Sequence, residues 1–256
     1  MNLGEYGEAL AYDAAFWLEG TDDPDLPLGE MGRTCLELAE KFRSMAIVCL
    51  IAKANPDLFF HHLMRAGHIW TKYLERVQQE RGFDDHHFCS GRCKPLLDAI
   101  AACDLPLARR IAELSPSEFR EGHEYDDDYC YAQAISRFIA EPARDGEVPP
   151  LLERFVAYVD DQPNERLAVS QALATRDQRG FDEAFDGLLQ SRDLGIDEDK
   201  ARGQLEEPQV VAQRLVFVEG LAILRLAERR GLRTEREYRY CPSLARVPMR
   251  TPFPGM

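Results

Sequence analysis

The sequence predicts an all-α fold, a single irregular bundle or stack of about eight to ten antiparallel helices with an extended C-terminal tail. Apolar residues recur at helical spacing along almost the whole chain of 256 residues. No convincing run shows the alternation of a half-buried strand, and β-branched residues are few. The segments between the periodic stretches carry the residues that cap and break helices, namely Gly, Pro, Asn and Asp.

Three long helices are predicted first, at residues 9–18, 31–54 and 58–81. The second and third are separated by an Asn-Pro-Asp sequence, because proline disfavours helix in the residue before it. Asp57, the last residue of that sequence, is expected to cap the third helix. A glycine follows each of the first and third helices closely, as is common at helix ends.

A pair of short helices is predicted next. The first covers residues 94–102, and Asp104 is expected to cap the second, with Pro106 in its first turn. Residues 115–118 read S-P-S-E, which matches a capping box because a glutamate follows the serine by three positions. No fixed period relates this pair to other segments, so a regular repeat array is not indicated.

Five further helices are predicted at residues 125–139, 150–159, 165–175, 181–190 and 209–230. The last is apolar on more than one side, a pattern typical of a central, nearly encircled helix.

Residues 233–256 contain four of the fifteen prolines and five arginines. Proline cannot continue a helix, so we expect this tail to lie extended on the surface of an all-helical domain formed by residues 1–232.

The formal charge of −14 comes from 31 basic and 45 acidic side chains. Such a surface repels phosphate backbones, which disfavours nucleic-acid binding, and attracts a basic partner at long range. The start of the chain lacks the basic and apolar regions of a secretory signal, and its longest apolar run, residues 45–52, is too short to span a bilayer. The sequence therefore predicts a soluble cytoplasmic protein without a membrane partner.

Seven cysteines occur at irregular spacing. An odd number is difficult to reconcile with a disulfide framework. Cys35, Cys49 and Cys103 lie in apolar stretches, so we expect reduced, buried thiols.

One loop concentrates possible metal ligands. It follows the third predicted helix and contains His86, His87, Cys89 and Cys93. Zinc favours these ligand types, but the H-H-x-C-x3-C spacing is not that of a standard finger or ribbon. Adjacent histidines also point in different directions. We therefore favour a polar loop without a metal or other cofactor, and keep zinc binding as the alternative.

The most polar stretch, residues 121–131, reads E-G-H-E-Y-D-D-D-Y-C-Y and holds five carboxylates. One or two acidic residues would suffice to interact with the dipole of the helix that begins here. The excess, edged by tyrosines, suits the binding of arginines and lysines. The candidate partner contacts are the carboxylates Glu124, Asp126, Asp127 and Asp128, with Tyr125 and Tyr129 as anchors.

Four segments resemble the bacterial immunity protein 49 family. They are P-L-L-D-A-I-A-A-C-D-L-P-L-A-R-R-I-A from residue 95, E-Y-D-D-D-Y-C-Y from 124, V-E-G-L-A-I-L-R-L-A-E-R-R-G-L from 218, and E-Y-R-Y-C-P-S-L-A-R from 237. The resemblance spans most of residues 30–246. It implies an all-helical protein that protects a cell by binding a polymorphic toxin, delivered by contact or by a secretion machine, in the cytoplasm. The family defines no catalytic residues.

The leading hypothesis is therefore a non-enzymatic inhibitor of a cognate toxin, which could have a basic active-site cleft. Phosphate-binding loops, nucleophile elbows and paired zinc-binding histidines on a helix are missing. Two alternatives stay open. One is a metal-dependent hydrolase that uses Asp126 to Asp128 with His86, His87 or His123, and the other is a helical adaptor without a toxin. The oligomeric state is also left open.

Overall fold

The computed structural model describes residues 3–80, 85–140, 146–160, 162–203 and 208–256. This part of the chain forms α-helices, short 3₁₀ segments and no strand, which confirms the all-α prediction. The α-helices in chain order are α1 (Leu3–Gly20), α2 (Leu28–Lys53), α3 (Pro56–Gln79), α4 (Lys94–Ala101), α5 (Leu105–Leu114), α6 (Asp126–Ile139), α7 (Val148–Val159), α8 (Glu165–Thr175), α9 (Gln178–Ala201), α10 (Pro208–Gln213) and α11 (Val218–Arg229). The 3₁₀ helix η3 (Ser243–Arg246) lies in the C-terminal segment.

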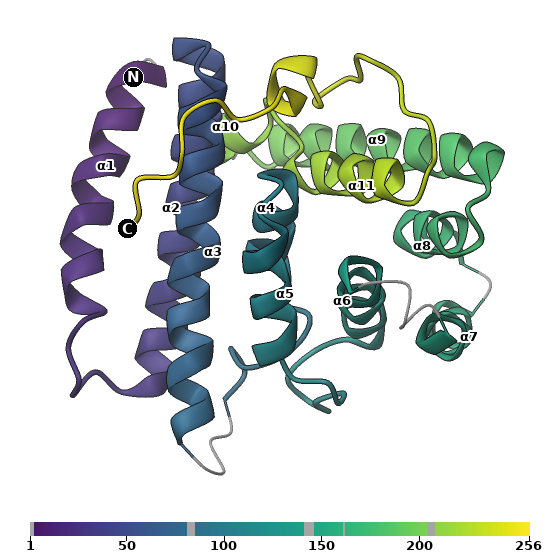
Figure 1. Ribbon diagram of the computed structural model, residues 1–256, viewed down its shortest axis with the longest axis horizontal. Coiled ribbons are helices and arrows are strands. Elements are labelled where there is room, and N and C mark those ends of the chain that lie inside the picture. Colours follow the sequence, from purple (N-terminus) through teal and green to yellow (C-terminus); the bar gives the residue numbers. More distant parts are fainter. Residues whose placement is uncertain (1–2, 81–84, 141–145, 161, 204–207) are drawn as a thin grey trace.

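The helices of the molecule run in different directions. Helices α1, α2 and α3 lie side by side with α4 and α5 next to α3, while α9 and α11 cross them nearly at right angles and α6, α7 and α8 are seen end-on (Figure 1). Helices α1 and α2 run antiparallel and close together: Lys41 of α2 donates to Asp13 of α1 over 3.3 Å, and a Cβ on Gly7 would lie 2.9 Å from Val48. Glycine at position 7 therefore permits this close packing.

The core is centred on α2 and α3. Phe59, Trp70 and Tyr73 of α3 are buried, with at most 1 % of each exposed. The Tyr73 ring lies against α2, where a Cβ on Gly32 would be 2.9 Å from it, and the Trp70 ring packs on Tyr73 with centroids 4.7 Å apart. At the other end of the core, α11 is buried along both of its sides, with Leu221 and Leu224 at 0 % exposure. For α11 the predicted central position is confirmed.

The predicted helix at residues 209–230 is instead two helices, α10 and α11, so the prediction of one continuous helix is wrong. The backbone N–H of Phe217, in the break, donates to the carbonyl of Tyr240 over 2.8 Å. In a continuous helix this N–H would donate to a carbonyl of the preceding turn, whereas here its acceptor belongs to the C-terminal segment.

Two predicted helix caps are also wrong. Ser115 does not start a helix: it ends α5, and its hydroxyl donates to the carbonyl of Ile111 over 2.8 Å. The cap of α3 is Asn55, whose side chain accepts from the N–H of Leu58 over 3.0 Å. The predicted cap of α5 is confirmed, since Asp104 accepts from the N–H of Leu107 over 3.0 Å.

Two other helices are longer than predicted. α1 begins at Leu3 and α9 extends to Ala201, while the predicted end of α3 at residue 81 falls outside the described residues. The extension of α9 is mostly polar, so periodicity of apolar residues does not detect it. The extension of α1 contributes Tyr6 to the core, which a window that begins at residue 9 leaves out.

Asp57 connects the C-terminal segment to α3 by hydrogen bonds. Its carboxylate accepts from the N–H groups of Arg250 and Thr251 over 2.8 and 3.1 Å. Phe253 then stacks on His68 of α3, with ring centroids 5.3 Å apart. The segment crosses over α2 and α3 in an extended course toward α1 (Figure 1).

The cysteines are free thiols. Cys35 and Cys49 are buried as predicted, but Cys103 is exposed, which corrects its expected burial. Cys103 follows α4 with a φ of 58°, in the turn that leads into α5. A left-handed residue that ends a helix commonly lies at the surface.

His62 gives the fold a dependence on pH. It lies buried in α3 with its ring 6.2 Å from that of Phe42, and burial, aided by Arg65, lowers its pKa from 6.5 to about 4. Between these two pH values the unfolded chain binds a proton that the folded chain excludes, so the free energy of unfolding decreases as the pH is lowered through this window.

When the pH is lowered from 7 to 5, we expect the free energy of unfolding of wild type to decrease by about 2 kcal/mol more than that of a His62→Gln variant, measured by urea unfolding. Equal losses in the two proteins would contradict this account.

Candidate functional site

The acidic segment forms a turn followed by the first turn of α6. Tyr125 precedes the helix in extended conformation and makes no side-chain cap. Asp126, Asp127 and Asp128 are the first three residues of α6. Their charges therefore lie where they interact favourably with the helix dipole.

Two of these carboxylates are paired with arginines of the same chain. Arg154 of α7 donates its Nε–H to Asp126 over 2.6 Å, and Arg166 of α8 donates to Asp128 over 3.1 Å. Burial raises the pKa of Asp128, and Arg166 acts against that shift. Asp126 and Asp128 thus connect α6 to the two following helices, and much of their charge is neutralised internally.

Glu124 and Tyr129 are also held internally. The carboxylate of Glu124 accepts from the N–H groups of Gly91 and Arg120 over 2.7 and 3.1 Å, which connects two loops. Tyr129 is 6 % exposed, and its hydroxyl donates to the carbonyl of Ser117 over 2.9 Å. Tyr129 therefore offers a partner very little surface in this conformation.

What stays accessible is a smaller surface. Tyr125 is 71 % exposed, Asp127 is half-buried, and Tyr158 of α7 is 46 % exposed. Tyr158 lies one helical turn after Arg154, which pairs with Asp126, so both lie on the side of α7 that faces the start of α6. Partial desolvation, followed by the charges of Asp127 and Asp126, raises the pKa of Tyr158. We call Tyr125, Asp127 and Tyr158 the α6–α7 patch. Tyr158 lies three residues after the buried Phe155, a spacing that suggests a core position, so sequence reasoning did not identify it as a candidate contact.

Behind this patch lies an ion-pair network. The guanidinium of Arg166 donates to both oxygens of Glu219 in α11, over 2.8 and 3.0 Å, and lies 4.8 Å from the ring centroid of Tyr131. Burial would raise the pKa of Glu219, but Arg166 outweighs it and lowers that pKa. Arg166 therefore connects α6, α8 and α11 through two carboxylates.

The four candidate ligands of the zinc alternative are not all brought together. His86 and His87 do lie close, with ring centroids 3.8 Å apart, which corrects the expectation that they point in different directions. Among the described residues, the ligand atoms that lie within 4.8 Å of one another belong to Asp85, His86 and His87. Neither cysteine belongs to this group: Cys89 donates its thiol to the carbonyl of His86 over 3.4 Å, and Cys93 is half-buried. Asp126, Asp127 and Asp128 are not part of it either, so the described residues do not assemble the ligand set of the hydrolase alternative.

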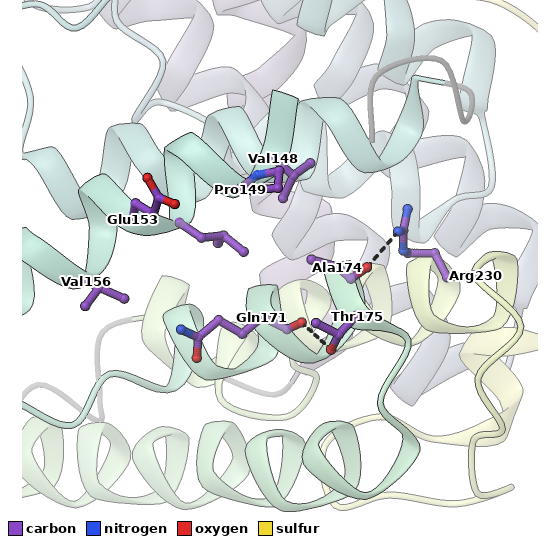
Figure 2. Close-up of a pocket in the computed structure, with 9 residues that line it drawn as sticks. Val148, Pro149, Glu153, Val156, Gln171, Ala174, Thr175 and Arg230 are labelled. Atoms are coloured by element: carbon purple, nitrogen blue, oxygen red, sulfur yellow. Dashed lines mark hydrogen bonds between the residues drawn. The ribbon is translucent and has the colours of Figure 1, made fainter. Parts of the chain in front are cut away.

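A surface pocket of about 450 Å³ lies between α7 and α8 (Figure 2). Val148, Pro149 and Leu152 line one side, and Gln171, Ala174 and Thr175 line the other. Arg230 at one end donates to the carbonyls of Leu173 and Ala174 over 2.6 and 3.4 Å. The walls are mainly apolar, and the carboxylate among them is Glu153. Such a pocket suits an apolar side chain better than acid–base chemistry, which needs paired titratable groups.

Across the described helices, none combines the length and the apolar character needed to cross a membrane.

Comparison with known proteins gives one match, to a protein family. No curated protein and no solved structure matches the chain. The sequence pattern of the family described as Immunity protein 49 matches residues 45–245, which run from the last third of α2 into η3 and contain the α6–α7 patch and the Arg166 network. The chain belongs to the Immunity protein 49 family.

Proposed function

We propose that this chain is an immunity protein that binds a cognate antibacterial toxin in the cytoplasm and blocks it by direct contact. The observation that carries the proposal is family membership over residues 45–245. The charge of −14 supports it, because an acidic protein is attracted at long range to a basic active-site cleft. Inhibition by contact needs no catalytic group, so the proposed protein is not an enzyme and needs no cofactor.

The α6–α7 patch is the proposed contact on the acidic segment. Tyr125 and Tyr158 would flank Asp127, and tyrosines beside a carboxylate suit arginine or lysine side chains. Tyrosine is also enriched among the residues that dominate binding energies. Glu124, Asp126 and Asp128 would add negative potential, while Tyr129 would support the patch from beneath.

A triple variant, Tyr125→Ala/Asp127→Lys/Tyr158→Ala, tests the contact. The candidate toxin is the product of the neighbouring gene. We expect the triple variant to weaken binding to it by about 10- to 100-fold, because the variant removes two aromatic contacts and reverses one charge. Binding is measured by titration calorimetry and protection by survival of cells that express the toxin. Asp197→Lys, which changes an exposed residue of α9 in the same way, is the control.

Three results separate the possibilities. Wild-type protection with an unaffected triple variant would place the contact elsewhere on the molecule. Lack of binding and protection by wild type would remove the immunity function and favour an adaptor role. Unchanged helical circular dichroism of the triple variant shows that any loss of binding is not a loss of fold.

A further inference from the structure

Helix α1 presents large aromatic side chains to solvent. Its inner side packs Tyr6, Leu10 and Ala14 into the core. On its outer side Tyr12 is 80 % exposed and Phe16 is 70 % exposed. An exposed apolar residue is ordinary, but two adjacent exposed aromatics on one helix face are typical of a protein contact.

The outward residues form a defined stripe. At 3.6 residues per turn, Tyr12 and Phe16 share an arc of about 80° with three glutamates. The α1 stripe consists of Glu5, Glu8, Tyr12, Phe16 and Glu19. Its aromatic residues lie in the middle and its carboxylates toward the two ends, which resembles the apolar centre and polar rim of protein interfaces.

Charge indicates the kind of partner. Helix α1 carries four carboxylates and no lysine or arginine, and its Asp13 is paired with Lys41 of α2. In α6, by contrast, arginines of α7 and α8 neutralise two of the acidic residues. A second copy of the chain would bring the same carboxylates against the stripe, and like charges disfavour that pairing.

We propose that the α1 stripe binds a basic amphipathic helix of the cognate toxin. Apolar residues of that helix would cover Tyr12 and Phe16, and lysines or arginines near its two ends would meet Glu8 and Glu19. Packing of one helix against another is a common mode of recognition. The inference rests on the proposed function and names the partner surface for it.

Two features make the stripe separately testable. α1 lies outside the matched residues 45–245, so this surface is a property of the chain beyond the matched family region. It also lies at one edge of the molecule, with α7 at the opposite edge (Figure 1). Changes in the stripe are therefore far from the α6–α7 patch.

The test uses a Tyr12→Ala/Phe16→Ala variant and the product of the neighbouring gene as the candidate toxin. Alanine favours helix, so α1 is expected to persist. We expect the dissociation constant to rise by about 30-fold or more, because exposed aromatics commonly dominate binding. Leu194→Ala, which removes a side chain of α9 that is 65 % exposed, is the matched control and should leave binding unchanged.

A second variant, Glu8→Lys/Glu19→Lys, tests the charges. It should slow association and reduce its dependence on salt, since charges at a rim act mainly on the rate of encounter. Wild-type affinity in the alanine variant, with wild type itself binding the toxin, would overturn the α1 proposal and leave the immunity function intact. So would a change of oligomeric state in that variant without a change of toxin affinity. If wild type does not bind the toxin, the immunity function fails first.

Discussion

Replacing Asp98 by alanine is expected to lower the free energy of unfolding by about 3–5 kcal/mol, which is typical when one partner of a buried ion pair is removed. Asp98 of α4 is 0 % exposed and Arg43 of α2 is 8 % exposed. The guanidinium donates to both carboxylate oxygens over 2.7 and 2.8 Å. In the variant this guanidinium would remain buried without its carboxylate. Urea unfolding at pH 7 measures the loss.

A double variant separates loss of the pair from loss of packing. Arg43→Met/Asp98→Leu replaces both charges by apolar groups, which commonly restores much of the stability. We therefore expect it to unfold at a higher urea concentration than Asp98→Ala. A loss below about 1 kcal/mol in Asp98→Ala would show that water or other groups solvate Arg43 and would contradict the buried pair.

Much of the fold follows from local sequence. The bounds of α8 agree with the prediction, and Asp104 caps α5 as expected. Both features depend on residues within one or two helical turns, namely a cap and an apolar repeat. Sequence reasoning can evaluate such interactions because the participating residues are close along the chain.

The errors arise where distant residues decide. The break between α10 and α11 involves a hydrogen bond from Phe217 to Tyr240, 23 positions later. Asp57 does not cap α3 because it binds backbone groups of Arg250 and Thr251. In each case a plausible local pattern loses to a tertiary contact that the sequence alone does not reveal.

The same limit applies to the candidate site. The sequence located the acidic start of α6, but it could not show that Arg154 and Arg166 neutralise part of it from 28 and 38 residues away. It predicted a helix at residues 9–18, but not that Tyr12 and Phe16 would face away from every other helix. Burial and charge pairing depend on which helices pack together. They therefore decide which of the predicted contact residues remain accessible to a partner and which other residues become accessible.

Replacing Arg166 by methionine is expected to lower the free energy of unfolding by about 3 kcal/mol at pH 7, because it leaves carboxylates without their charged partner. Methionine retains the apolar stem of the side chain, so the change removes mainly the guanidinium. Glu219 would then lie partly buried without the guanidinium that it pairs with in wild type. The helical circular dichroism should be unchanged, since α8 keeps its cap at Asn164.

The pH dependence of this loss identifies its cause. In wild type Arg166 lowers the pKa of Glu219 despite burial, so the stability that this pair contributes is present above the unfolded pKa of 4.5 and is lost as pH falls through the lower folded value. In Arg166→Met, burial without the arginine should raise that pKa, so protonation near pH 5 would relieve the variant. The stability difference between wild type and variant should therefore be smaller at pH 5 than at pH 7.

The control is Arg179→Met, which breaks an ion pair with Glu183. The two side chains of that pair are 88 % and 66 % exposed, so the variant should change the free energy of unfolding by less than about 0.5 kcal/mol. A difference for Arg166→Met that is independent of pH would attribute the loss to packing rather than to the ion pair.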